Sequence, residues 1–411
     1  MSDLLHIDRD RLWKTIEASA AIGTFEAGLR RLSLTDEDRE MRDLFVSWAQ
    51  TSGYAVTIDA VGNIFVRREG TDTQADPVVI GSHLDTQIYG GRFDGVLGVL
   101  SGLEVLRTLD DNNVRTKRPI EVVNWTNEEG ARFTPAMMGA FVFTGRFDLE
   151  DVHAKRDPDG LTFGSELKRI GYCGEAPVGG RALDAYYELH IEQAPALDRN
   201  GFDIGIVVGS YKVCSMRIAF RGVTAHVGPT PMDERQNPLV GAGYMIAATN
   251  DIGLKYAPED GKSTASRIDC HPNRFGIISN YVELCVDYRH PEQAGLQAME
   301  GEFEAALKQS AEKARVSAEI LDVWRYGDAD FSEELISGMR QIAPQISSRV
   351  HELKSQAGHD AYAIAEIAPT AMIFTPCKDG ITHNTGEDID PERTWPGVDL
   401  LLNAVVMRAD R

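Results

Sequence analysis

The chain has 411 residues, of which 43% are apolar and 26% are charged, and its formal net charge is −21. This length exceeds what one hydrophobic core usually serves, so we expect two domains. The strong negative charge argues against nucleic acid or an anionic membrane surface as a partner.

The amino-terminal residues are acidic where a secretory signal would be basic, and their apolar positions recur at helical spacing. No stretch approaches the ~18 uncharged apolar residues that a membrane span needs. The five cysteines are scattered without a Cys-x-x-Cys pair, which is typical of reduced thiols and argues against thiolate-bound zinc. We therefore expect a cytoplasmic protein.

The first predicted elements are two helices and a hairpin. Residues 1–50 have the apolar spacing of two helices, and Thr35 is placed to cap the second one. Residues 55–70 alternate apolar and polar side chains about Gly62-Asn63, a pattern typical of a hairpin.

Three short apolar strands come next in the chain. We expect them in residues 77–85, 118–130 and 185–193. Residues 95–111, between the first two strands, have the apolar spacing of a buried helix. Strands that alternate with helices predict an α/β catalytic domain with a mostly parallel sheet flanked by helices.

The pattern changes near residue 212, where alternating segments and amphipathic segments follow one another. Their order of strand, helix, strand, helix and strand predicts an inserted α+β domain over residues 212–327. The α/β pattern resumes near Phe331 and closes with a strand and a loop in residues 370–389. The catalytic domain is therefore expected to comprise residues 1–211 and 328–411.

Side chains that suit metal chemistry fall at the ends of the three apolar strands. His83 ends the first strand, Glu128 and Glu129 follow the second, and His190 lies near the end of the third. In open α/β sheets, ligands bind beyond the carboxyl ends of the strands. A single histidine there is more often a surface residue, and an Asn-Glu-Glu-Gly sequence is more often a solvated turn. The four features together favour a site.

Hydrolysis of a stable amide or ureido bond needs parts that this sequence contains. A metal pair can polarise the carbonyl group and deprotonate a water while a carboxylate bridges the ions. A second carboxylate must carry the proton from the water to the leaving nitrogen. The candidate ligands are His83, Asp94, Glu129, His190 and His383, and Glu128 is the candidate base. Imidazole and carboxylate ligands suit Zn, Mn, Co or Ni and distinguish them poorly.

Seven segments resemble successive motifs of the M20-type metallopeptidase superfamily. They are GSHLDTQIYGGRFDGVLGVL, TNEEGARF, ELHIEQ, TAHVGPTPMDERQNP, VDYRH, AGHDA and THNTGED. More narrowly, the sequence resembles the hydantoinase/carbamoylase branch, which includes N-carbamoyl-L-amino-acid hydrolases and allantoate amidohydrolases. The match extends from about residue 80 to residue 390, nearly the whole chain.

The resemblance implies a role for each matching residue of the metal site. His83 and His190 would bind one divalent ion, Glu129 and His383 would bind the other, and Asp94 would bridge both.

The resemblance also implies the catalytic and substrate contacts. Glu128 would be the general base and acid, and Asp85 would orient the His83 imidazole. Gln193 would lie close to the scissile group. His226, in the insertion, would polarise the substrate carbonyl, reaching the site across a homodimer interface or on domain closure. Arg289 would bind the carboxylate of a small anionic substrate.

These substrate contacts have plainer alternatives. Arg289 follows an alternating strand, where an exposed arginine is usual. His226 could be a histidine in a turn. Gly358, in AGHDA, would shape the substrate pocket, but this segment could equally begin a helix.

One segment departs from the family pattern. The family has an asparagine where this sequence has Gly276, and a Pro-Gly pair where it has Ser279-Asn280. The catalytic motifs are intact and the recognition segment is altered. We therefore expect a binuclear metal amidohydrolase that cleaves the linear C–N bond of an N-carbamoyl-L-amino acid or related ureido acid, with hydroxide held by the metals as nucleophile. Allantoate or an N-acyl amino acid is the alternative substrate, and a non-catalytic dimeric binding protein of the same fold is a distant one.

Overall fold

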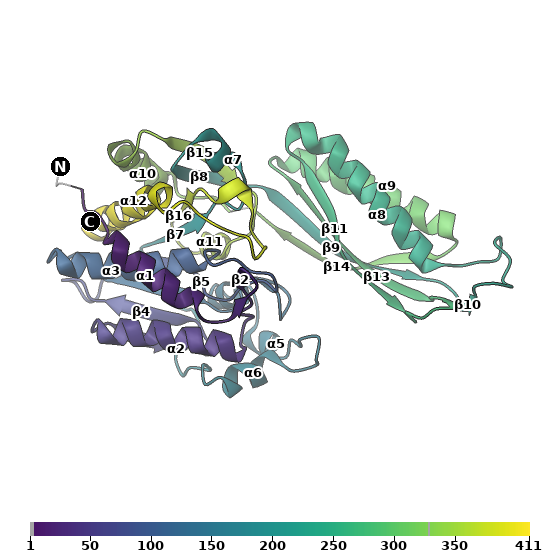
Figure 1. The fold of residues 1–411 in the computed structure, drawn as a ribbon, viewed down its shortest axis with the longest axis horizontal. Coiled ribbons are helices and arrows are strands. Elements are labelled where there is room, and N and C mark those ends of the chain that lie inside the picture. Colours follow the sequence, from purple (N-terminus) through teal and green to yellow (C-terminus); the bar gives the residue numbers. More distant parts are fainter. Residues whose placement is uncertain (1–3, 328) are drawn as a thin grey trace. The chain divides into compact units, whose positions relative to one another are not determined.

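The computed structural model (Figure 1) describes residues 4–327 and 329–411. Residue 328, the expected first residue of the second catalytic segment, lies outside the described residues. The backbone divides into two compact units, Met1–Gly209 with Ala329–Arg411 (unit 1) and Ser210–Asp328 (unit 2). The functions expected of the catalytic domain and of the insertion stay predictions.

The amino-terminal part of unit 1 holds the predicted helices and hairpin. Helices α1 (Arg9–Ala20) and α2 (Asp36–Thr51) are separated by a small hairpin of β1 (Thr24–Phe25) and β2 (Gly28–Leu29). The Thr35 hydroxyl oxygen accepts the amide hydrogen of Asp38, which confirms Thr35 as the cap of α2. The predicted hairpin is also confirmed, because β3 (Ala55–Ile58) pairs antiparallel with β4 (Ile64–Arg68).

An eight-stranded sheet, in the order β15-β8-β16-β7-β5-β6-β4-β3, forms the centre of unit 1. Its four central strands are β5 (Val78–His83), β6 (Ile120–Trp125), β7 (Ala185–Ile191) and β16 (Thr370–Thr375). They run parallel and every residue in them is buried, as expected for a parallel sheet covered on both faces. The α/β fold with a mostly parallel sheet is therefore confirmed.

Two strands of this sheet were not predicted from the sequence. Strand β8 (Ile204–Ser210) is antiparallel to β16 and contains two glycines, which are rare in strands. Strand β15 (Val350–Ser355) lies at the edge and only its last residue is fully buried, so its sequence needs no apolar run. Both extend the sheet away from the strands that carry the predicted site.

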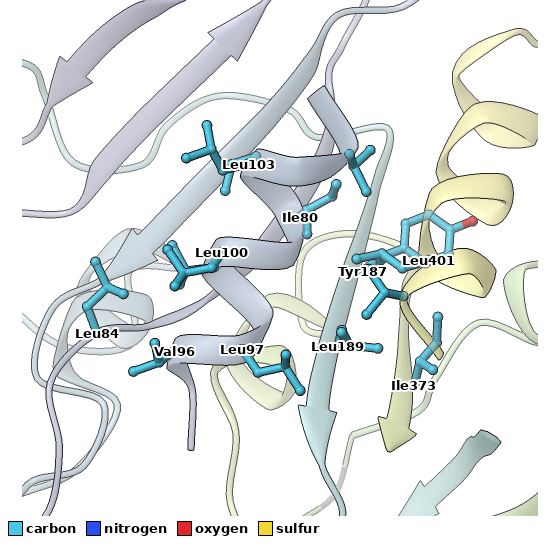
Figure 2. Packing of buried hydrophobic residues seen from close by; sticks show 14 of the residues in the cluster. Ile80, Leu84, Val96, Leu97, Leu100, Leu103, Tyr187, Leu189, Ile373 and Leu401 are labelled. Carbon is cyan, nitrogen blue, oxygen red and sulfur yellow. The ribbon is translucent and has the colours of Figure 1, made fainter. Parts of the chain in front are cut away.

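Helix α3 (Val96–Asp111) packs on the central strands and begins directly after the loop that follows β5. Thirteen of its sixteen residues are buried, which explains the nearly continuous apolar run in this segment. Figure 2 shows Leu97 of α3 near Leu189 of β7. Full burial of each such leucine contributes about 1.5–3 kcal/mol. This packing holds the first turn of α3, and with it the preceding loop, against the sheet.

The remaining helices of unit 1 are short or lie toward the carboxyl terminus. They are α4 (Met138–Phe143), α5 (Leu149–His153), α6 (Phe163–Arg169), α7 (Ala196–Asn200), α10 (Glu333–Ile346), α11 (Asp360–Ile364), the 3-10 turn η2 (Lys378–Gly380) and α12 (Pro391–Ala409). Helix α12 packs on β7 and β16, and α11 contacts the same strands. None of the described helices of the chain is both long and apolar enough to cross a membrane.

Unit 2 is a four-stranded antiparallel sheet with two long helices on one face (Figure 1). The strand order is β11-β13-β9-β14. The elements are β9 (Lys212–Arg221), α8 (Pro238–Tyr256), η1 (Ala257–Glu259), β11 (Lys262–His271), β13 (Tyr281–His290), α9 (Gln293–Ala314) and β14 (Ser317–Tyr326), with the short pair β10 (Ala225–His226) and β12 (Ile277–Ile278). Strand β11 is an addition to the predicted order, and its polar, mostly exposed residues explain why its sequence lacks an apolar pattern.

Candidate metal centre

The carboxyl edge of the central strands gathers six of the predicted site residues. His83 is the last residue of β5, His190 lies in β7, and Glu128 and Glu129 follow β6. Asp94 comes from the loop before α3, and His383 comes from the loop after β16. These segments are far apart in the sequence and meet because parallel strands end at the same edge of the sheet.

The two oxygens of Asp94 face two different groups of side chains. Asp94 Oδ1 lies 3.7 Å from His83 Nε2 and 3.2 Å from His190 Nε2. Asp94 Oδ2 lies 3.4 Å from His383 Nε2, and that nitrogen is 3.3 Å from Glu129 Oε2. Each group offers three ligand atoms within 4.8 Å of one another. The structure therefore brings together two potential metal-binding groups that share one carboxylate.

Both buried histidines direct their Nε2 atoms toward the Asp94 carboxylate. His83 Nδ1 lies 2.9 Å from the Asp85 carbonyl oxygen, and His190 Nδ1 lies 2.9 Å from the Ile191 carbonyl oxygen. A carbonyl oxygen can only accept, so each Nδ1 carries the proton and donates it. In the neutral imidazole, Nε2 is then the unprotonated nitrogen, which is the form that binds a metal ion.

The electrostatics of the site favour a cation among the carboxylates. Burial and the neighbouring carboxylates raise the pKa of Glu128 and Glu129 well above the usual range. Burial also opposes ionisation of Asp94, but its hydrogen bond with His190 and the nearby imidazoles outweigh this and lower its pKa. Burial lowers the pKa of His83 to about 4, which keeps its imidazole neutral. Burial opposes the charged form of His190, but its hydrogen bond with Asp94 outweighs this and raises its pKa. A crowd of buried carboxylates with two imidazoles among them fits divalent metal ions.

Glu128 lies beside the metal-binding groups without belonging to either. Its Oε2 atom is 3.4 Å from His83 Nε2, whereas the Glu129 carboxylate is directed to His383. Glu128 is 7% exposed. The adjacent glutamates therefore turn to different neighbours, as expected for a base next to a ligand.

Asp85 contacts the site differently from what the sequence suggested. Its backbone carbonyl, and not its carboxylate, bonds the His83 ring, because the carboxylate oxygen nearest the ring nitrogen is 3.9 Å away. The carboxylate instead accepts the amide hydrogens of Glu128 and Glu129, at 3.3 Å each. Asp85 thus orients the backbone that carries the two glutamates as well as the ring of His83.

Three amide or hydroxyl side chains hold the carboxylates of the site. Gln193 Nε2 and Thr382 Oγ1 donate to Asp94 Oδ2 over 2.9 and 2.8 Å. Gln87 Nε2 donates to Glu129 Oε2 over 2.9 Å. Only Gln193 was singled out from the sequence. Gln87 and Thr382 lie inside the quoted motifs, but nothing in their type or spacing distinguished them from ordinary loop residues.

A second group of polar residues lies behind His190. Glu188, two residues earlier in β7, accepts hydrogen bonds from Ser82 and from the Ala361 amide, and burial raises its pKa to about 7. Side chains two residues apart in a strand point to the same face, so the sequence could have placed Glu188 beside His190. The His359 ring packs against the His190 ring, with centroids 4.5 Å apart, at the start of α11. Gly358 precedes this ring, and its predicted role in the substrate pocket stays a prediction.

Left-handed backbone conformations occur at three residues that are not glycine and that lie at or next to the site. They are Asn127 (φ 58°), Gln193 (φ 59°) and His383 (φ 50°). Such conformations cost about 1–3 kcal/mol each and persist where the surrounding structure requires them. The chain therefore accepts local strain to place these side chains.

The two residues of the insertion that were predicted to contact substrate, His226 and Arg289, lie in unit 2. His226 is exposed on β10, and its Nδ1 accepts the amide hydrogen of Gly228 over 3.1 Å. Arg289 is on β13 and donates from Nε to the Asp287 carboxylate over 2.7 Å. Their predicted contacts with substrate stay predictions.

Comparison with known proteins identifies the family. Residues 79–406 match the family described as Peptidase family M20/M25/M40. This chain belongs to the M20 family. The superfamily predicted from the motifs is therefore confirmed, and the M20 family is one of hydrolases.

Relatives of this M20 chain agree with the narrower branch. An N-carbamoyl-L-amino-acid amidohydrolase of Rhizobium meliloti is 41% identical over 405 residues, which cover 98% of this chain and 97% of the relative. A solved amidase of the hydantoinase/carbamoylase family from Burkholderia vietnamiensis is 43% identical, with a TM-score of 0.95 and coverage of 99% and 98%. Allantoate deiminase 1 of Glycine max is 28% identical over 423 residues, covering 94% of this chain and 86% of the relative.

Proposed function

We propose that this M20 hydrolase cleaves the linear C–N bond of an N-carbamoyl-L-amino acid or a related ureido acid. The observation that carries the proposal is the Asp94 carboxylate, whose two oxygens face His83 with His190 and Glu129 with His383. The similarity to an N-carbamoyl-L-amino-acid amidohydrolase over almost the full length supports the substrate class. The similarity to an allantoate deiminase supports allantoate as the alternative.

In this proposal the two groups around Asp94 hold two divalent ions, which would polarise the scissile carbonyl and make a water acidic. Zn, Mn, Co and Ni all suit these ligands. Glu128 takes the proton of the attacking water and carries it to the leaving nitrogen. Burial and the neighbouring carboxylates raise the pKa of Glu128, which makes its carboxylate a stronger base and supports this role.

Four further residues would bind the substrate in this proposal. Gln193, which already donates to Asp94, would lie next to the scissile group. His226 would polarise the carbonyl and Arg289 would bind the carboxylate, with Gly358 lining the pocket. Because the segment around Gly276 differs from the family pattern, substrates with an unusual ureido or acyl group should be tested first. Carbamoyl substrates would give the free amino acid, ammonia and carbon dioxide.

The proposal is tested by comparing two neighbouring isosteric variants on a panel of ureido and N-acyl acids. Glu128→Gln is expected to retain both metal ions and to lose turnover by a factor of about 10²–10⁴, the usual contribution of a general base. Glu129→Gln is expected to lose metal content, because Glu129 belongs to one of the two groups. Metal analysis and ammonia release measure these outcomes. Full activity of Glu128→Gln, or activity that survives chelation, would refute the mechanism.

We also propose that the protein forms a homodimer through unit 2. Helix α8 exposes large apolar side chains on the side away from its own sheet: Leu239 (43% exposed), Val240 (42%), Tyr244 (44%) and Leu254 (67%). A row of exposed apolar residues on one helix is typical of a protein interface. Val240→Glu should produce monomers in sedimentation experiments, whereas an exposed control, Ile367→Glu in unit 1, should not.

We also propose a cytoplasmic location. All five cysteines are free, which supports it, because free thiols are typical of the reducing cytoplasm.

A further inference from the structure

Glu387 connects two loops of the metal centre and was not singled out from the sequence. It lies in the loop that follows β16, four residues after His383, and it is 2% exposed. Its Oε1 atom accepts the amide hydrogens of Phe93 over 2.9 Å and of Asp94 over 3.1 Å. One carboxylate oxygen thus holds the backbone of the loop that carries Asp94.

The second oxygen of Glu387 reaches the same residue through a side chain. Thr382 Oγ1 lies 3.0 Å from Glu387 Oε2 and 2.8 Å from Asp94 Oδ2. Glu387 therefore contacts both the backbone of Asp94 and the hydroxyl group that fixes the Asp94 carboxylate. These contacts, together with the bond from Gln193, restrain the direction in which the two oxygens of Asp94 point.

Gly91 leaves the space that this arrangement needs. A Cβ atom at position 91 would lie 1.9 Å from the carboxyl carbon of Glu387 and from its Oε1. Real Cβ atoms do not approach other atoms so closely, so a side chain here would displace the Glu387 carboxylate. Gly91 has no positive φ, and an alanine there is excluded by the contact and not by the backbone.

We propose that Glu387 is a positioning residue that sets metal affinity by holding Asp94 between its two groups of neighbours. The proposal rests on the proposed function only in taking Asp94 as the shared ligand. A shared ligand must present one oxygen to each side, and a carboxylate that rotates would lose one of these contacts. Replacing a residue that orients a metal ligand typically lowers metal affinity by a factor of about 10–100.

The test measures Co(II) binding to the metal-depleted full-length protein by calorimetry and by the visible absorption of bound cobalt. Glu387→Ala should weaken binding of at least one ion by about 10–100-fold and alter the cobalt spectrum. Glu387→Gln should stay within about threefold of the wild type, because its amide can accept from the two backbone groups and donate to Thr382. Rescue by this isosteric variant separates positioning from charge.

Gly91→Ala provides a second, independent test of the proposal. Gly91→Ala should weaken Co(II) binding about as much as Glu387→Ala, because it expels the same carboxylate. The double variant should be no weaker than Glu387→Ala alone, since the two changes remove one interaction. Additive losses, or unchanged affinity in Glu387→Ala, would overturn the proposal. If Glu387→Ala does not fold, Gly91→Ala alone gives the decision, with about 10–100-fold weaker binding expected.

Glu104 is the matched control, because it is another buried carboxylate, on α3, and it accepts hydrogen bonds from the Asp8 amide, Arg11 and Thr108. Glu104→Ala should lower the melting temperature and leave Co(II) affinity unchanged. A wild-type protein that binds cobalt but hydrolyses no ureido or acyl acid would refute the proposed function and leave this inference standing. Variants with unchanged affinity would refute only this inference.

Discussion

Replacing Gly95 by alanine should damage the metal centre through a single methyl group. Gly95 immediately precedes α3 with φ 66° and ψ −45°, and the amide of Val96 donates to the Asp94 carbonyl over 2.7 Å across it. A Cβ at this position would lie 2.4 Å from Cε1 and Nε2 of the His83 ring. Atoms in normal contact are about 3.5–4.0 Å apart, so the ring must move by about 1 Å.

The expected cost has two parts. The backbone conformation is one that residues with a Cβ rarely adopt, which should reduce the free energy of unfolding by about 1–3 kcal/mol. Misplacement of a reacting group by about 1 Å can lower the rate about 10²-fold, which corresponds to roughly 2.7 kcal/mol in the activation free energy. The loss of rate arises from the displaced His83 ring, so metal content and turnover should both fall.

A matched variant separates these two parts. Gly171 also has a positive φ, of 80°, but a Cβ there would meet nothing within 4 Å. Gly171→Ala should therefore be destabilised while keeping the metal content and turnover of the wild type. Urea unfolding, metal analysis and ammonia release are measured for both. If Gly95→Ala kept the turnover and metal content of Gly171→Ala, the contact with His83 would have no functional consequence and the reasoning would fail.

Three further outcomes are expected. After chelation, the melting temperature should be higher at about pH 5.5 than at about pH 7.5. Burial raises the pKa of Asp85, Glu188 and Glu387 to about 7, so the folded protein keeps protons that the unfolded chain releases above about pH 4, and stability falls as the pH rises. The lowered pKa of His83 acts in the opposite direction, but it is one group against three. A flat or rising profile without metal would contradict this. Arg31→Lys should lower the free energy of unfolding by about 3 kcal/mol in urea, because the buried guanidinium donates to the carbonyls of Ser19, Ile22 and Leu84, and a lysine cannot replace all of these bonds. Leu103→Ala, at a fully buried position of α3, should cost about 2–5 kcal/mol, whereas Ile367→Ala, at a position 46% exposed and outside the proposed interface, should change stability by less than about 0.5 kcal/mol.

The sequence by itself determined the elements that build the centre of unit 1. Apolar runs ending at His83 and shortly before Glu128 predicted buried strands, because only residues covered on both faces form such runs. Since the carboxyl ends of parallel strands meet at one edge, the approximate place of the site followed from the same pattern. The edge strands β11 and β15 escaped this reasoning, because their exposed residues need no apolar pattern.

Only the tertiary structure decided how the site residues contact one another. Periodicity reports local conformation and burial, whereas a hydrogen bond between two loops depends on the path of both loops through space. The division of the Asp94 oxygens between two groups, the bonds from the amides of Glu128 and Glu129 to the Asp85 carboxylate, and the bond from Thr382 to Asp94 are all contacts of this kind. Each joins atoms whose distance is set by how the loops are packed, and no local pattern in the chain encodes that distance.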